Sequence, residues 1–225
     1  MTGIYCFSGS GHSLAVAEAL ARMLGFEVRP MEGEAGTEAV AVAVFPVYCQ
    51  NIPKPVKAFL QRMPAKHVVL IATYGKISYG NVLYEAQKLL NGQVIAGAYI
   101  PMGHSFLNGD FAFDQERLLP IVQRLRKPQP VRIPKSHKNP LSNIFPGLRS
   151  RLGGKITREA SCNGCGTCER LCPMGAIHRG RIHSPCIRCL RCVTGCPEKA
   201  LQFKNSRILD TYLKRYRKED YVLYL

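Results

Sequence analysis

Eight of the ten cysteines in this 225-residue chain lie near its C-terminal end, and they repeat one spacing twice. Each copy reads Cys-x2-Cys-x2-Cys-x3-Cys-Pro. Three thiolates spaced in this way on a tight loop can cap three irons of a 4Fe-4S cubane, so the fourth sulfur must come from elsewhere. The spacing therefore predicts two iron-sulfur clusters. The first copy contains Cys162, Cys165, Cys168 and Cys172, and the second contains Cys186, Cys189, Cys192 and Cys196.

This spacing resembles that of bacterial ferredoxins with two clusters, in which the cysteine before proline ligates the other cluster. The resemblance implies that Cys172 and Cys196 exchange between the two copies. Small residues within the copies, such as Gly164, Gly166 and Gly195, would let backbone N–H groups approach the sulfurs. The implied ligand sets are Cys162, Cys165, Cys168 and Cys196 for one cluster, and Cys186, Cys189, Cys192 and Cys172 for the other.

Two other uses of these cysteines fit the pattern less well. Zinc takes four ligands, usually as two Cys-x2-Cys pairs, which leaves the third cysteine of each copy without a role. A disulfide framework requires an oxidising compartment. The pattern favours iron-sulfur clusters over both alternatives.

The composition is that of a globular chain with room for one or two domains, because 46% of its residues are hydrophobic. No run approaches the roughly 18 apolar residues of a membrane span. The start of the chain lacks the basic and apolar regions of a secretory signal. We therefore expect a cytoplasmic protein without a membrane span, in a reducing interior.

The net charge of +16 is concentrated in the C-terminal part. Residues 1–127 contain 12 Lys and Arg against 9 Asp and Glu, whereas residues 128–225 contain 19 against 6. Two oxidised clusters with their thiolates would offset about four of these positive charges. The remaining basic face indicates an acidic redox protein as partner, although a solvated surface that only balances the clusters is an alternative. No recognised nucleic-acid-binding module accompanies the charge, which disfavours nucleic acid as a partner.

The N-terminal segment predicts a strand, a loop of small residues and a helix. The apolar run Gly3–Phe7 precedes Ser8–Ser13, and Leu14–Leu24 has helical periodicity. Hydroxyls and backbone N–H groups at a helix N-terminus favour a phosphate monoester, although a plain tight turn would look similar. The loop lacks the glycine patterns of nucleoside triphosphate and dinucleotide sites. It resembles the phosphate loop of flavodoxins, which wraps the phosphate of FMN without a cationic side chain.

Strands and helices continue to alternate after this loop, which predicts a doubly wound sheet of five parallel strands. Ligands of such sheets bind beyond the carboxyl ends of the strands, so the loops Pro46–Pro53 and Thr73–Asn81 should join Ser8–Ser13 at the site. Pro120 lies deep in the last predicted helix and either kinks it or marks its start. The further strands are expected at 26–29, 39–45, 68–72 and 94–100, and the further helices near 53–63, 82–90 and 114–126.

Tyrosines and a glycine of these loops, and a histidine after the fifth strand, are candidates for contacts with a flavin ring. Because the chain contains no Trp, Tyr48, Tyr74 or Tyr79 would have to supply the aromatic faces. Gly75 could let a backbone carbonyl turn toward the reduced ring. His104, after the fifth strand, is a candidate proton donor, although a structural, hydrogen-bonded histidine is the more common outcome.

The chain divides into a flavodoxin-like part at residues 1–127, a basic Pro-rich connection at 128–157, a small α+β part at 158–204 and a C-terminal tail at 205–225. A short helix is expected within 143–152, and a hairpin around Gly180 should link the two cysteine copies. Apolar residues in helical register predict a basic helix for the tail. We expect this helix to pack on the body and not to anchor in a membrane, because its apolar stripe is short.

Taken as a whole, the sequence is similar to the flavodoxin-ferredoxin fusion proteins of anaerobic bacteria and archaea. The resemblance rests on segments 7–13, 46–48 with Pro53, 73–75, 103–106 and the two cysteine copies. It implies an α/β flavodoxin-like domain followed by a two-cluster ferredoxin domain, with FMN and two 4Fe-4S clusters. Ser10 and His12 stand where the family tends to have Thr and Asn. The implied FMN contacts are Ser8, Gly9, Ser10, Gly11, His12, Ser13, Pro46, Val47, Tyr48, Thr73, Tyr74, Gly75 and Tyr79.

Three functions follow from this interpretation. The first is an electron-transfer protein that exchanges electrons between its clusters and FMN and docks an acidic ferredoxin, flavodoxin or reductase. The second is a flavin-dependent reductase of a small unsaturated or quinone-like substrate, to which His104 or a loop tyrosine supplies a proton. The third is a binding module with structural or sensory clusters and no flavin. The sequence does not determine the oligomeric state.

Overall fold

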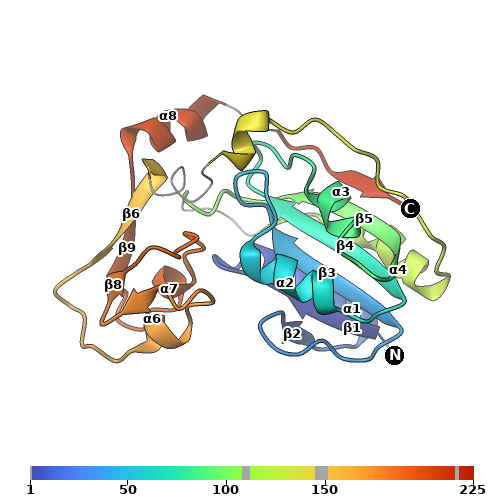
Figure 1. Cartoon of the computed structure of the whole chain (residues 1–225), viewed down its shortest axis with the longest axis horizontal. Helices are drawn as coiled ribbons and strands as arrows, with labels where there is room; N and C mark the ends of the chain where they lie inside the picture. Colours follow the sequence, from blue (N-terminus) through green and yellow to red (C-terminus); the bar gives the residue numbers. More distant parts are fainter. Residues whose placement is uncertain (1, 108–111, 145–151, 216–217) are drawn as a thin grey trace.

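The computed structural model describes residues 2–107, 112–144, 152–215 and 218–225. It contains a larger α/β part built on a six-stranded sheet and a smaller part that carries the two cysteine copies. Figure 1 shows the larger part on the right, with helices on both sides of the sheet, and the smaller part on the left. The C-terminal segment returns from the smaller part to the sheet.

Five of the six strands of the central sheet are parallel, which confirms the predicted, mostly parallel α/β architecture. The strand order is β10-β5-β4-β3-β1-β2, so the direction of winding changes between β1 and β3. Doubly wound sheets bind ligands at such a point. The strands are β1 (Thr2–Cys6), β2 (Val28–Pro30), β3 (Val40–Pro46), β4 (His67–Tyr74), β5 (Gln93–Pro101) and β10 (Val222–Tyr224).

The sheet has a sixth strand, β10, whereas the sequence predicts five strands. The sequence predicts a helix throughout the tail, but α8 (Arg207–Arg215) covers only its beginning. The end of the tail forms β10, antiparallel to β5, with Val222 opposite Tyr99 and Tyr224 opposite Gly97. This pairing covers backbone groups that an edge strand would leave unpaired. The tail therefore contributes to the larger part.

Helices cover both faces of the sheet and enclose two cores. One core lies under α2 and α3, and the other lies under α1 and α4. Pro120 lies in the first turn of α4, so it marks the start of that helix and does not kink it. The helices are α1 (His12–Leu24), α2 (Lys54–Arg62), α3 (Val82–Gln87) and α4 (Leu119–Arg126), the last preceded by a 3-10 turn at Gln115–Leu118.

The connection between the two parts lies along the sheet. The Val131 N–H donates to the carbonyl of Val94 at 2.8 Å, and the Ile133 side chain is buried in the core. Lys138 forms an ion pair of 2.7 Å with Glu85. A 3-10 turn follows at Pro140–Asn143, whereas most of the helix expected within 143–152 lies outside the described residues.

The smaller part consists of two antiparallel strand pairs and two short helices. The strands β6 (Gly154–Arg158) and β9 (Leu201–Asn205) form one pair. The strands β7 (Ile177–His178) and β8 (Arg181–Ile182) form the hairpin that the sequence predicts around Gly180. The helices are α6 (Thr167–Arg170) and α7 (Arg191–Thr194). Within the described residues, the structure has no helix with the length and apolar character that crossing a membrane requires.

Candidate functional site

The two cysteine copies form the same backbone loop. In each copy, three positions take the left-handed conformation, and these positions match between the copies. The first copy has glycine at all three, whereas the second has larger side chains, although such residues adopt this conformation at a cost. The matched pairs are Gly164 with Arg188 (φ 77° and 56°), Gly166 with Leu190 (φ 72° and 67°) and Gly175 with Lys199 (φ 56° and 49°).

Hydrogen bonds to sulfur are repeated in the same way. The Ala176 N–H donates to the Sγ of Cys172 at 3.2 Å, and the Ala200 N–H donates to the Sγ of Cys196 at 3.3 Å. Such backbone bonds stabilise thiolates and tune clusters. The second copy is therefore a structural repeat of the first.

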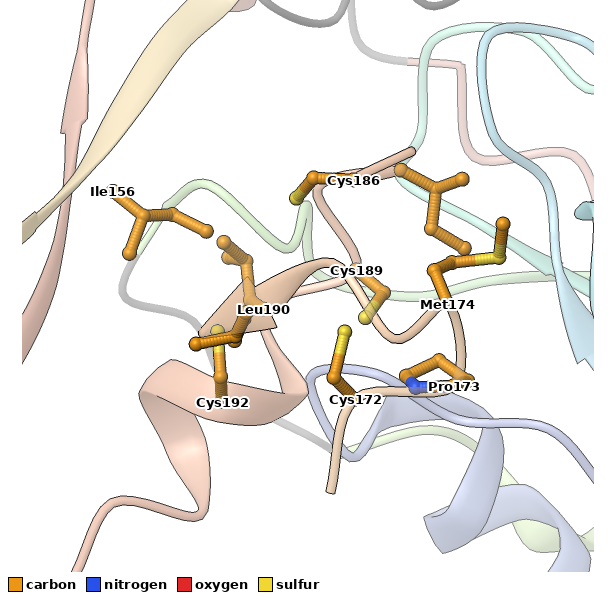
Figure 2. Close-up of a pocket in the computed structure, with 10 residues that line it drawn as sticks. Ile156, Cys172, Pro173, Met174, Cys186, Cys189, Leu190 and Cys192 are labelled. Carbon is orange, nitrogen blue, oxygen red and sulfur yellow. The ribbon is translucent and has the colours of Figure 1, made fainter. Parts of the chain in front are cut away.

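One predicted ligand set lines a single cavity in the smaller part. Figure 2 shows the Cys172 and Cys189 side chains, which come from different copies, turned toward one another. The exchange of Cys172 that the resemblance implies is compatible with this arrangement. The cavity is lined by Cys172, Cys186, Cys189 and Cys192, with Ile156, Pro173, Met174, Ile177, Ile187 and Leu190 around them.

The thiols of this cavity are buried and close together. Burial is the main cause that raises the pKa of the Cys192 thiol to about 12, and the sulfurs of Cys189, Cys186, Cys172 and Cys168 raise it further. Burial also raises the pKa of the Cys189 thiol, although the Arg191 N–H lowers it. Thiols in such surroundings ionise at neutral pH when a metal replaces their protons. The four sulfurs thus have the chemistry of metal ligands.

The first copy is more exposed. The Cys165 side chain lies at the surface with its Sγ 3.3 Å from the Thr167 hydroxyl, and a hydrogen bond from this hydroxyl to the thiolate is the main cause that lowers the pKa of Cys165. The Cys168 thiol is close enough to Cys162 for that sulfur to raise its pKa, after the larger effect of burial. The contribution of Cys196 to this set stays a prediction.

The described cysteine side chains do not form a site for a single metal ion. Among the residues that the structure describes, no three His, Cys, Asp or Glu side chains are arranged to share one metal ion. In a cubane each cysteine sulfur binds a different iron, so the four sulfurs surround the cluster and do not converge on one point.

The second cysteine loop lies directly against the Ser8–Ser13 loop of the larger part. The Nε of Arg191 donates to the Ser8 carbonyl at 2.9 Å, and the Thr194 hydroxyl donates to the Gly9 carbonyl at 3.2 Å. A Cβ on Gly9 would lie only 1.9 Å from the carbonyl oxygen of Cys189, so this close approach requires glycine. A proposed cluster ligand therefore contacts the proposed phosphate loop through backbone atoms.

Further contacts hold the two parts together. The Arg191 guanidinium pairs with Glu32 and lies 5.0 Å from the centre of the Phe7 ring. At a second place, the Phe106 and Phe203 rings stack with their centres 4.4 Å apart. Sequence reasoning missed these residues because their partners are distant in the chain. Only the basic and aromatic character of the residues gave a signal.

The Ser8–Ser13 loop turns from the end of β1 into the N-terminus of α1. Gly11 takes a left-handed conformation (φ 96°) at the N-terminus of α1, and its N–H donates to the Ser8 hydroxyl at 3.2 Å. The Ser10 hydroxyl donates to the Ser105 hydroxyl at 2.8 Å, and a 2.7 Å bond joins the Ser13 and Thr73 hydroxyls. These bonds join the ends of β1, β4 and β5, whereas the sequence predicts a site at the ends of β1, β3 and β4.

A cavity adjoins this loop between β2 and the smaller part. Loop residues lie on its border together with the charged side chains of Arg29, Glu32 and Arg191. The predicted residues of the other two loops do not line it. The cavity is lined by Cys6, Ser8, Gly9, Ser10, Gly11, Leu14, Val28, Arg29, Pro30, Glu32, Arg191 and Thr194.

Two of the three candidate tyrosines are occupied by other contacts. The Tyr79 ring stacks on Tyr99 with centres 4.0 Å apart, and the Tyr74 ring contacts it edge to face. The Tyr74 hydroxyl donates to the Asp220 carbonyl of the tail at 2.7 Å. Tyr48 instead lies beside Gly9, where burial and then the charge of Cys189 raise the pKa of its phenol.

His104 lies against the backbone of Gly75, where an added Cβ would come 2.5 Å from its ring. The Phe106 N–H donates to His104 Nδ1 at 3.3 Å, which leaves the proton of the neutral ring on Nε2. Burial, with a smaller effect of His12, lowers the pKa of His104 to about 4. This side chain is therefore neutral near pH 7, as a structural histidine would be.

One comparison with known proteins gives a match. Residues 156–178 match the Fer4 family, described as a 4Fe-4S binding domain. The match begins in β6, includes the whole first cysteine copy and ends in β7. The chain thus contains a ferredoxin-like iron-sulfur part, which supports at least one 4Fe-4S cluster and iron-sulfur electron transfer. No curated protein and no solved structure matches the chain.

Proposed function

We propose that this protein is an iron-sulfur flavoprotein that passes electrons between two 4Fe-4S clusters and FMN. The matched Fer4 domain supports the first cluster. The repeated backbone of the second copy supports the second, because its three left-handed positions correspond to those of the first. The parallel strand order β2-β1-β3-β4-β5 supports the flavodoxin-like part, since flavodoxins have this order.

One observation carries the proposal. The second cysteine loop contacts the candidate phosphate loop directly, with the Cys189 carbonyl against Gly9 and the Tyr48 hydroxyl close by. Cys189 and Cys192 are only 9% and 6% exposed. A cluster on this loop would have protein, and not solvent, between it and a flavin at the end of the sheet. Such an arrangement suits electron transfer between the two cofactors.

The residues that would hold FMN are those of the first loop and its neighbours. Ser8–Ser13 would bind the phosphate, and Tyr48 is the candidate aromatic contact, because Tyr74 and Tyr79 already pack on each other. When bound, FMN can store two electrons and thereby link one-electron carriers to two-electron chemistry. The chain itself would bind and orient the flavin and exclude water from the space between the cofactors.

The exposed first cysteine copy and the basic C-terminal part of the chain suit docking of a protein partner. We expect an acidic redox protein, such as a ferredoxin, flavodoxin or reductase, to exchange electrons at the exposed Cys165 loop in the cytoplasm. Salt should slow this exchange, because exposed charges are screened. Rates that do not change with ionic strength would argue against electrostatic docking.

The carrier fits the structure better than the alternative, a reductase of small molecules. Tail residues contact Tyr74, and Cys189 contacts Gly9, so protein covers these two residues, whereas a cavity adjoins Ser8, Ser10 and Gly11. Because the pKa of His104 is lowered to about 4, its ring is neutral near pH 7 and has no imidazolium proton to give to a substrate.

Anoxic purification of the full chain tests the proposal. The expected preparation contains about eight irons per chain, as two four-iron clusters require. It also releases FMN on denaturation. Bound zinc without iron, or a preparation that neither contains FMN nor takes it up, would contradict the proposal.

A further inference from the structure

Arg191 is held in a fixed position between the second cysteine loop and the larger part. Its Nε donates to the Ser8 carbonyl at 2.9 Å, and its guanidinium pairs with Glu32 and lies 5.0 Å from the centre of the Phe7 ring. These three contacts, on different segments of the chain, restrict where the charge can lie. Only 22% of the side chain is exposed, so water screens this charge less than one at the surface.

The charge of Arg191 acts on a predicted cluster ligand. Arg191 follows Cys189 by two residues and directly precedes Cys192. Burial is the main cause that raises the pKa of the Cys189 thiol, and both the backbone N–H and the positive charge of Arg191 oppose this rise. A charge that favours the thiolate of Cys189 also favours additional negative charge on a cluster that this sulfur ligates.

The first copy has a neutral side chain at the corresponding position. Thr167 stands in the place of Arg191, and its hydroxyl contacts Cys165. An arginine of that copy, Arg170, lies at a different position, where it donates to the Cys165 carbonyl at 3.1 Å and is exposed to solvent. Water and salt screen an exposed charge more strongly than a partly buried one. The two copies therefore differ in the electrostatic field at their sulfurs.

Burial by itself would make the second cluster harder to reduce than the first. Cys189 and Cys192 are only 9% and 6% exposed, whereas Cys165 lies at the surface. Reduction adds one negative charge to a cluster that is already negative with its thiolates, and a poorly solvated site disfavours that charge. An electron that enters at the first copy would then move uphill in energy on its way to the flavin. A cation beside the second cluster opposes this effect.

We propose that Arg191 raises the reduction potential of the second cluster and thereby allows the first cluster to reduce it. This inference rests on the proposed function and deepens it, because it gives the electron path a direction from the exposed copy to the flavin. The transfer moves one electron, so the first cluster is oxidised, the second is reduced, and no bond forms or breaks. Arg191 is a positioning residue that acts through its charge, whereas Glu32 holds the guanidinium in place and offsets part of that charge.

Redox titrations of the anoxic full chain, followed by electron paramagnetic resonance, test this assignment. The potentials of both clusters are compared for the wild type, Arg191→Gln, Arg191→Lys and Glu32→Gln. The glutamine variants break the same ion pair, but one removes its positive charge and the other its negative charge. Arg170→Gln is the matched control, because it removes an exposed arginine beside Cys165. Cys165→Ala, which keeps only the second cluster, identifies the signal of that cluster, and iron content checks that the other variants retain both.

Arg191→Gln should lower the potential of the second cluster, and Glu32→Gln should raise it. The expected shift for Arg191→Gln is about tenfold in the equilibrium between the two clusters, the effect of one partly buried charge, or about 59 mV for a one-electron couple. Arg191→Lys, which keeps the charge, should stay close to the wild type, and Arg170→Gln should leave the second cluster unchanged. A merely structural role predicts another pattern. Loosening of the contact would admit water, which favours the more negative reduced form, and would raise the potential in both glutamine variants.

Two results would overturn the inference. One is an unchanged potential of the second cluster in Arg191→Gln, and the other is a shift of the same sign in Arg191→Gln and Glu32→Gln. Failure of the proposed function gives a different result. A wild type with about four irons per chain contradicts the pair of clusters and, with it, this inference. A wild type with both clusters but without FMN contradicts only the flavin proposal, and the opposite shifts would still support the role of Arg191.

Discussion

The two cysteine copies have the same backbone but different surroundings. The first copy faces solvent, with Cys165 exposed and small residues at its left-handed positions. The second copy contacts the sheet through Cys189, Arg191 and Thr194. The cysteine loop needs only its spacing and backbone, so the other residues of each copy are free to specialise.

This difference gives each copy a distinct part in the proposed electron path. An exposed cluster can exchange electrons with a protein partner, whereas a buried cluster beside the sheet can exchange them with a flavin. Arg191 illustrates the specialisation. Thr167 occupies the matching position of the first copy, and its hydroxyl contacts Cys165 and Arg170 of that copy, whereas Arg191 reaches Ser8 and Glu32 in the larger part.

The largest expected effects come from removing one ligand from each copy. Cys189→Ala and Cys165→Ala should each reduce the iron content from about eight to about four per chain, because each destroys one four-iron site. Cys189→Ala should abolish reduction of the flavin through the first cluster. Cys165→Ala should instead slow electron uptake from a protein donor. Iron analysis and stopped-flow absorbance check both outcomes.

The same two variants test whether the two copies differ in their part in electron transfer. If Cys189→Ala still reduces its flavin at the wild-type rate with the first cluster intact, the second copy does not lie on the path. Equal defects in electron uptake for both variants would show that exposure does not distinguish the two copies.

A smaller effect is expected from changing the glycine at the contact. Gly9→Ala places a Cβ 1.9 Å from the Cys189 carbonyl, so the second cysteine loop must move away from the sheet. The connection should then become easier to cleave in limited proteolysis, and flavin reduction should slow. Gly33→Ala is the control, because its nearest neighbour would lie at an ordinary 3.6 Å. Equal protease resistance of the two variants would contradict the contact.

Arg191→Ala should weaken the same contact without a clash. It removes the hydrogen bond to Ser8, the pair with Glu32 and the contact with Phe7, which together contribute about 2 kcal/mol. Thr167→Ala, the matching change in the first copy, should cost less than about 1 kcal/mol. Denaturant unfolding of the anoxic protein measures both. An equal cost for the two variants would contradict the expected larger contribution of Arg191 across the boundary.

The smallest expected effect concerns backbone strain. Lys199 is exposed and takes φ 49°, so Lys199→Gly should leave the free energy of unfolding unchanged or raise it by up to about 1 kcal/mol. Gly175→Ala, at the matching position with φ 56°, should lower it by about 1 kcal/mol. Thermal unfolding of the two variants should therefore shift in different directions. Shifts of the same sign would show that the two loops differ in backbone energetics.

Local patterns in the sequence were sufficient to predict the parallel strands, the helices of the larger part and the hairpin at Gly180. Buried parallel strands are continuous apolar runs, as in β3 and β4, and a helix such as α1 has a clear apolar periodicity. The loops at the strand ends were predictable for the same reason. Their assembly at one edge follows from the parallel order.

Contacts between distant segments could not be predicted in this way. The tail was expected to be helical because α8 is amphipathic, and nothing local in Tyr221–Tyr224 indicates that it pairs with β5. The same limit applies to Arg191. Its sequence neighbourhood is that of a cluster loop, whereas its side chain bonds to the Ser8–Ser13 loop at the other end of the chain.

Anomalous diffraction at the iron edge, on anoxic crystals of the full chain with its flavin, tests the central claim most directly. The account predicts two four-iron peaks, of which one is ligated by Cys186, Cys189, Cys192 and Cys172. This peak should lie next to density for FMN on the Ser8–Ser13 loop. A single iron peak at the first copy, or a flavin bound away from the second, would contradict it.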